Sequence, residues 1–241
     1  MKSKYYFISD IHFGFDSPSK EVEKEKLFVE FIDKIIPDCK TLFILGDLFD
    51  YWFEYRTVLQ KGYFGVFTAL KKLTSNGTGV YYFIGNHDFM HRDFFEKEIG
   101  VKLLKDEISI NLENKKFFLA HGDDFVKNDL GYKILKKILR SKVNQFLYSL
   151  LHPDIGIWLA RLSSKKSRGY TDKKDYGKVD GLFEFAKKKI KEGYDYVIFG
   201  HVHRLKDEKF EAGRYINLGS WLSEPHYGEF SNNEFKIKKV S

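Results

Sequence analysis

The sequence has little of several features that would assign a chain to a familiar class of protein. One cysteine among 241 residues, Cys39, excludes a disulfide within the chain, and we expect an inert, packed thiol in a reducing, cytosolic compartment. No stretch reaches the roughly 20 apolar residues that span a bilayer, because the longest weakly charged one, 143–160, is interrupted at His152-Pro153-Asp154. The first ten residues pass directly into a strand-like run without a charged and then apolar leader. We therefore expect neither an integral membrane protein nor a signal peptide.

What the chain does have is a core and an uneven charge. Its 43% apolar and 17% aromatic content excludes a disordered or collagen-like chain. The formal net charge is +7, but residues 130–192 alone hold 16 Lys and Arg against 6 Asp and Glu. The positive charge therefore belongs to one segment.

Short apolar runs alternate with amphipathic helical patterns. Helical spacing of apolar residues predicts one helix around 27–35, stopped by Pro37, and another around 66–73, closed by Asn76-Gly77. This order predicts an α/β fold with a mainly parallel sheet, or two sheets flanked by helices. Residues 130–192 look mostly helical, and we interpret them as a cap inserted into a core of residues 1–129 and 193–241. The predicted strands are 5–9, 41–45, 80–84, 117–120, 196–199 and 215–218.

Polar residues suited to metal chemistry follow five of these strands. Ligands of an open α/β sheet gather beyond the carboxyl ends of its strands, and residues i and i+2 of an extended chain can present two donors to one point. Each motif alone also fits helix capping or a turn, whereas together they indicate two divalent ions. Donors from His, Asp and one Asn, without Cys, favour Mn²⁺, with Fe²⁺ or Zn²⁺ as alternatives. The motifs are Asp10-Ile11-His12, Gly46-Asp47-Leu48-Phe49-Asp50, Gly85-Asn86-His87-Asp88, His121-Gly122-Asp123 and Gly200-His201-Val202-His203.

In this order the motifs resemble those of the calcineurin-like metallophosphoesterase superfamily. The resemblance implies a four-layer α-β-β-α sandwich and a pair of metal ions bridged by Asp47. It implies that Asp50, Asp88 and Asp123 accept hydrogen bonds that orient the ligating histidines or their loops. The implied ligands are Asp10, His12, Asp47 and His203 at one metal, and Asp47, Asn86, His121 and His201 at the other.

Within the superfamily, residues 42–52, 121–132 and 215–221 resemble the UDP-2,3-diacylglucosamine diphosphatase family of the lipid A pathway. That resemblance implies cleavage of a nucleotide-linked glycolipid to UMP and 2,3-diacylglucosamine 1-phosphate, by a cytoplasmic enzyme peripherally associated with the inner membrane. One departure is His87, where well-known members have Arg and the wider superfamily has His. The substrate-binding residues carried over are Asn86, His87, Asp129 and His201.

For the reaction, we expect the two cations to lower the pKa of a water molecule and so to supply the nucleophile. Metal charge, held by Asp47, and the Asn86 amide would stabilise the charge that builds on phosphate oxygens. His87, held near the site by Asp88, would protonate the leaving oxygen. The catalytic residues predicted are thus Asp47, Asn86 and His87.

Residues 130–151 predict a basic amphipathic helix. Apolar residues recur at helical spacing opposite Lys133, Lys136, Lys137, Arg140 and Lys142. Such a helix can lie at an anionic membrane surface with its apolar face toward acyl chains. The alternative is that the stripe packs on the core and the lysines are only solvated.

Other functions stay open from sequence. A nuclease or cyclic-nucleotide phosphodiesterase would share every metal ligand, and a phosphoprotein phosphatase would need an open groove. A nucleic-acid partner is not expected, since the aromatic residues of the basic segment do not interleave with its cations. A non-enzymatic scaffold is disfavoured because no ligand position is eroded.

Overall fold

The computed structural model describes residues 2–125, 137–171 and 181–240, and its strands form two sheets. The first has the order β11-β10-β1-β2-β3-β4. Strands β1 to β4 run parallel, and the hairpin β10-β11 pairs antiparallel with β1. The strands are β1 (Lys4–Ile8), β2 (Cys39–Ile44), β3 (Gly79–Phe83), β4 (Lys102–Leu104), β10 (His226–Ser231) and β11 (Glu234–Lys239).

The second sheet has the order β5-β6-β7-β9-β8. Its central strands β6, β7 and β9 are parallel, while β5 and β8 pair antiparallel at the two edges. The strands are β5 (Ile108–Leu112), β6 (Lys115–Leu119), β7 (Tyr196–Phe199), β8 (Leu205–Phe210) and β9 (Gly213–Leu218).

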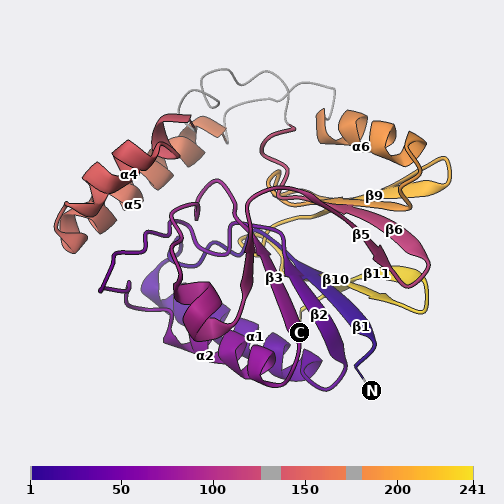
Figure 1. Ribbon diagram of the computed structural model, residues 1–241, viewed down its shortest axis with the longest axis horizontal. Coiled ribbons are helices and arrows are strands. Elements are labelled where there is room, and N and C mark those ends of the chain that lie inside the picture. The colour runs from indigo at the N-terminus through magenta and orange to yellow at the C-terminus, as the bar shows by residue number, and fades with distance from the viewer. Residues whose placement is uncertain (1, 126–136, 172–180, 241) are drawn as a thin grey trace.

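Helices cover the outer face of each sheet, and apolar side chains fill the space between the sheets. Helices α1 (Pro18–Ile35) and α2 (Phe64–Ser75), with the π-helical turn η1 (Phe95–Ile99), pack on the first sheet, and α6 (Gly181–Lys191) packs on the second (Figure 1). Between the sheets, the Phe7 ring stacks on Phe43 at 5.1 Å and on Phe117 at 6.0 Å. The predicted four-layer α-β-β-α sandwich is confirmed.

The segment predicted as one amphipathic helix is not continuous. Residues 137–139 are helical, Arg140 lies in a turn, and Ser141 is the extended N-cap residue of α4 (Lys142–Ser149). Helix α5 (Pro153–Thr171) follows. The prediction of a single helix over 130–151 is therefore wrong at Arg140-Ser141, because a β-region residue at the N-cap ends one helix before the next begins. Residues 130–136 lie outside the described residues.

Helix α6 differs from α4 and α5 in its packing. Its buried Leu182, Ala186 and Ile190 contact the second sheet, including Phe118 and Tyr215. It thus forms the outer layer of the sandwich, although the expected cap of residues 130–192 included it. Helices α4 and α5 lie apart from that layer, beyond the ends of the strands (Figure 1). Among the described residues, no helix has both the length and the apolar character needed to cross a bilayer.

Candidate metal centre

All five motifs meet at one end of the sandwich, directly after β1, β2, β3, β6 and β7. Parallel strands end at the same edge of their sheet, and the two sheets bring their edges together. Five residues there have left-handed backbones with φ between 50° and 68°, a conformation uncommon outside glycine. Such strain clusters at functional sites, where the surrounding structure enforces it. The five are Asp10, His12, Asp47, His201 and His203.

One group of donors comprises Asp10, His12, Asp47 and His203, whose ligand atoms lie within 4.8 Å of one another. The Nε2 atoms of His12 and His203 are 3.0 Å apart, and the Nε2 of His203 lies 3.4 Å from Asp10 Oδ1. Asp10, His12 and Asp47 are buried, whereas the His203 side chain is 35% exposed. The group therefore opens to solvent on the His203 side.

A second group shares Asp47 with the first. His121 Nε2 lies 3.4 Å from Asp47 Oδ2, and the Asn86 Oδ1 lies 2.9 Å from both His121 Nε2 and His201 Nδ1. The His121 Nδ1 donates to the Leu45 carbonyl at 2.8 Å, so its Nε2 faces the cluster. The structure thus brings together all seven predicted ligands in two groups joined by Asp47.

The surroundings of the Asp47 carboxylate fit a bound metal ion. Asp47 Oδ1 accepts the His87 backbone N–H at 2.9 Å, but among the described residues buried Asp47 Oδ2 has no hydrogen bond, only the ion-pair contact with His121 Nε2 at 3.4 Å. A buried carboxylate oxygen without a donor is costly unless a cation neutralises it. Oxygen and imidazole donors converging on such an atom suit divalent first-row metals.

The electrostatics of the cluster show that its buried carboxylate attracts positive charge. Burial raises the pKa of Asp47, but His121, His87 and His12 outweigh it and hold that pKa well below its usual value. Burial lowers the pKa of His121, yet Asp47 overcomes this and raises the pKa to about 10. Burial and the neighbouring His121 lower the pKa of His201 to about 4, which leaves a neutral imidazole that can ligate. The proton on His121 therefore provides, beside Asp47, the positive charge that a bound metal would provide.

Two glycines make the close approach of the loops feasible. A Cβ at Gly46, which has φ +91°, would collide with the His121 ring, and a Cβ at Gly85 would collide with the Asp47 carboxylate. Any larger residue would push apart the loops that carry the ligands of the second group.

The partner of His87 differs from the prediction. His87 Nδ1 donates to the backbone carbonyl of Asp50 at 2.9 Å and lies 3.9 Å from Asp50 Oδ1, so Asp50, not Asp88, holds this ring. Asp50 Oδ1 also lies 3.7 Å from His12 Nδ1. One buried carboxylate therefore faces both a predicted ligand and the predicted acid.

Asp88 instead fixes the loops. Its carboxylate accepts the N–H groups of Leu48 at 2.7 Å and Gly85 at 2.9 Å, and the hydroxyl of Tyr82. Burial and the charge of Asp47 raise the pKa of Asp88 to about 7. Asp88 thus ties the loop after β2 to the loop after β3, the role predicted for loop-orienting acids.

Sequence reasoning missed a buried ion network beneath His12. Lys24 of α1, 8% exposed, donates to the His12 carbonyl at 3.1 Å and pairs with Asp16 at 2.7 Å and Glu21 at 3.0 Å. Glu21 in turn accepts the Gly14 N–H at 2.9 Å. This contact could not be predicted from the sequence. The start of the helix is rich in Glu and Lys, and such segments usually face solvent.

A second missed support lies after β9. Ser220 Oγ donates to the Asp10 carbonyl at 2.8 Å, and the backbone N–H of Trp221 donates to the same oxygen at 3.1 Å. Asn217 donates to the carbonyl of Gly200, the residue before His201. Residues 215–221 therefore position the loop of Asp10 and the loop of His201.

The inserted helices reach the core through the loop that follows Asp50. Ser164 of α5 donates to Asp50 Oδ2 at 2.6 Å, and Arg161 Nε donates to the Tyr51 hydroxyl at 2.8 Å. The Phe53 ring lies 4.7 Å from Tyr148 of α4. Asp129, a predicted substrate contact, lies outside the described residues.

The apolar faces of α4 and α5 are exposed. On α4 no residue is buried, and Phe146 and the C-cap residue Leu150 are 63% and 67% exposed. On α5, Ile155 and Trp158 are more than half exposed. We call the exposed apolar side chains of the two helices the cap face; they are Val143, Phe146, Leu147, Leu150, Ile155, Trp158, Leu159 and Leu162. The alternative that the α4 stripe packs on the core is wrong.

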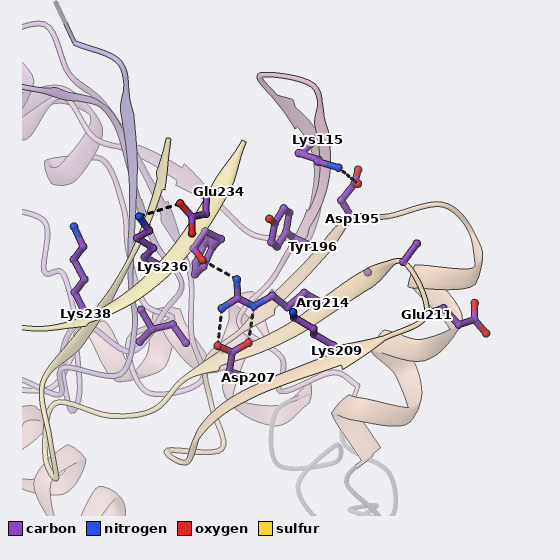
Figure 2. Close-up of a pocket in the computed structure, with 14 residues that line it drawn as sticks. Lys115, Asp195, Tyr196, Asp207, Lys209, Glu211, Arg214, Glu234, Lys236 and Lys238 are labelled. Atoms are coloured by element: carbon purple, nitrogen blue, oxygen red, sulfur yellow. Dashed lines mark hydrogen bonds and ion pairs between the residues drawn. The ribbon is translucent and has the colours of Figure 1, made fainter. Parts of the chain in front are cut away.

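A surface groove of about 810 Å³ lies along β8, β9 and β11 and shares no residue with the metal centre (Figure 2). Several of its charges are paired with one another: Lys115 pairs with Asp195 at 2.8 Å, and Arg214 makes two contacts of 2.6 Å with Asp207. Among the residues that the structure describes, the groove therefore lacks a convergence of His, Asp and Asn donors like that of the metal centre.

Comparison with known proteins agrees with this geometry. The model of the calcineurin-like phosphoesterase family matches residues 3–205. A protein of Porphyromonas gingivalis named UDP-2,3-diacylglucosamine hydrolase is 31% identical over 258 residues, covering 100% of this chain and 98% of that protein. Proteins of the same name from Haemophilus influenzae and Pseudomonas putida are 33% and 30% identical, covering 90% and 89% of each chain.

Proposed function

Because the chain belongs to the calcineurin-like phosphoesterase family, we propose that it hydrolyses the pyrophosphate bond of UDP-2,3-diacylglucosamine, releasing UMP and 2,3-diacylglucosamine 1-phosphate. The observation that carries the proposal is the convergence of seven donors in two groups that share the buried Asp47. The likeness of the chain to relatives with that name, over nearly their whole length, supports the substrate.

We propose that two divalent cations, Mn²⁺ in preference to Fe²⁺ or Zn²⁺, are held by the two groups. Asp10, His12 and His203 would hold one, Asn86, His121 and His201 the other, and Asp47 both. When bound, the pair would supply Lewis-acid charge and lower the pKa of a water molecule toward neutrality.

The remaining chemistry belongs to residues at the open side of the centre. His87 is 14% exposed and its Nδ1 donates to the Asp50 carbonyl, so Nε2 is the nitrogen that would pass a proton to the leaving oxygen. The Asn86 amide, whose oxygen faces His121 and His201, would present its N–H₂ group to a phosphate oxygen. His201 and Asp129 stay predicted substrate contacts.

The cap face supports an amphiphilic substrate. A cluster of eight exposed apolar side chains on two adjacent helices is unusual for a surface that faces only water. It lies on helices that contact the loop of Asp50, so acyl chains on this face would leave the phosphates near the metals. Basic residues of the same segment would favour peripheral contact with an anionic membrane surface, and hence a cytoplasmic site at the inner membrane.

The test is release of UMP from UDP-2,3-diacylglucosamine by the purified chain with added Mn²⁺, beside bis(p-nitrophenyl) phosphate. We expect hydrolysis of both, with a much higher kcat/KM for the lipid-linked nucleotide. Hydrolysis of the generic diester alone would reject the substrate and favour a soluble phosphodiester. Hydrolysis of neither, at full metal loading, would reject the reaction.

A further inference from the structure

A cation from the inserted segment reaches the edge of the metal centre. Arg140 Nη2 donates to the Gly85 carbonyl at 3.3 Å and lies 3.9 Å from Asp123 Oδ2. Gly85 directly precedes Asn86 and packs against the Asp47 carboxylate, and Asp123 lies two residues after His121. The guanidinium thus lies between two loops that carry predicted ligands.

Most of the hydrogen-bonding capacity of Arg140 is unused there. A guanidinium has five N–H donors, and within the described part of the chain only Nη2 has an acceptor. Its side chain is 32% exposed, so the other donors are open to a ligand. Planar donors of this kind match two oxygens of a phosphate at once.

Other contacts between the inserted helices and the core look different. Arg161 donates to the Tyr51 hydroxyl at 2.8 Å and lies over the Tyr51 ring at 5.8 Å, and Ser164 donates to Asp50 at 2.6 Å. These short contacts suffice to attach α5. Arg140 makes one long hydrogen bond and a distant ion pair, which suits a side chain that can exchange these partners for a stronger one.

We infer that Arg140 is a phosphate-binding residue that donates to a non-bridging oxygen of the substrate held at the metal centre. Asp123 keeps the guanidinium directed toward the centre, and Gly85 accepts one N–H until a phosphate arrives. The inference rests on the proposed function, because it assumes a phosphate at the two metals. It assigns to the turn before α4 a contact with the anion, distinct from the contact of the cap face with acyl chains.

The experiment compares Arg140→Gln and Arg140→Lys with Arg92→Gln, the same change at an exposed arginine outside the site. Binding of inorganic phosphate to each metal-loaded protein is measured by calorimetric titration, and kcat/KM is measured with UDP-2,3-diacylglucosamine. We expect Arg140→Gln to weaken phosphate binding and to lower kcat/KM by roughly 10- to 100-fold, the range for a hydrogen bond to a charged group. Arg140→Lys should lose less phosphate affinity and less kcat/KM, because lysine keeps the positive charge but not the planar pair of N–H donors. Arg92→Gln should match the wild type.

The phosphate titration separates this inference from the proposed function. If the wild type does not hydrolyse the lipid-linked nucleotide, the proposed function fails, but weaker phosphate binding by Arg140→Gln would still support the contact. Unchanged phosphate affinity at normal metal content would overturn it, and a lower melting temperature alone would show that Arg140 only attaches the segment. If Arg140→Gln does not fold, Arg140→Lys decides, since phosphate affinity equal to the wild type would overturn the inference.

Discussion

The metal centre and the cap face hold their side chains in opposite ways. In the centre, the side chains of Asp10, His12 and Asp47 are buried and their backbones are left-handed. Hydrogen bonds from several loops hold them in place. On α4 no residue is buried, and its contacts with the core are few. The chemistry of phosphorus depends on atom positions within fractions of an ångström, whereas an acyl chain requires only an apolar surface. Burial and hydrogen bonding are therefore concentrated where the reaction requires fixed atom positions.

The strongest test of the rigid region is Asp47→Ala. Removing the carboxylate shared by both groups should abolish hydrolysis and reduce bound metal to one ion or none per chain, since seven donors are more than a single tetrahedral ion uses. The sheet should stay folded, because the change also removes the buried Oδ2, which has no hydrogen bond within the described part of the chain. Metal analysis and far-ultraviolet circular dichroism check this. Two bound metals in a fully active variant would contradict it.

Changing His87 separates metal binding from proton transfer within the same region. His87→Ala should lower turnover by roughly 10²–10⁴-fold, the usual range for a general acid, while metal content stays near normal. Turnover and metal content are measured on the same preparation. Should the variant lose its metals, His87 is a ligand and the role proposed above is wrong.

Lys24 tests whether support outside the centre reaches the metals. Lys24→Met keeps the aliphatic stem but removes the ammonium that holds the His12 carbonyl, Asp16 and Glu21. We expect metal affinity to fall by roughly 10- to 100-fold, as for other groups that orient ligands. Lys26→Met is the control, because Lys26 is exposed on the same helix. Equal metal affinity of the two variants would show that the network serves folding alone.

The pH dependence of metal uptake follows from the pair of Asp47 and His121. In the metal-free protein Asp47 raises the pKa of buried His121 to about 10, so at neutral pH a metal must displace a proton. Affinity should rise about tenfold per pH unit below that pKa. The stability that the raised pKa of His121 gives the metal-free protein is present below pH 6.5 and is lost as the pH rises through about 10. Chelator competition at several pH values, with proton release measured in weak buffer, provides the check; affinity independent of pH would contradict it.

The smallest effect is expected on the cap face. The double change Phe146→Ser and Leu147→Ser should raise KM for the long-chain substrate by roughly three- to tenfold and leave bis(p-nitrophenyl) phosphate unaffected. Vesicle binding, measured at low and high salt, should weaken as salt screens the lysines. Val22→Ser on α1 controls for the loss of an exposed apolar side chain. An equal fall in kcat/KM for both substrates would show that the cap face has only a structural role.

How much the sequence predicts differs between these two regions. Central strands such as β2 and β7 are buried on both faces, so their apolar runs stand out, and the motifs after them predicted the residues that the structure brings together. Edge strands escaped prediction because exposure removes that signal, as in β8, which contains Lys206, Asp207 and Glu208. The roles of Asp50 and Lys24 depend on tertiary contacts between distant segments. The exposure of Phe146 could not be predicted either, because an apolar stripe has the same spacing whether it is buried or exposed to solvent.

The left-handed ligand residues have a consequence for how the protein tolerates mutation. Each of the five adopts a backbone conformation that glycine reaches freely and other residues at a cost on the order of 1 kcal/mol or more. Replacing one of them, such as the partly exposed His203, by glycine should therefore make the metal-free chain harder to unfold while it removes a predicted ligand. A selection for thermal resistance alone would drift toward an inactive protein, because at these positions the most stable sequence and the working sequence are different.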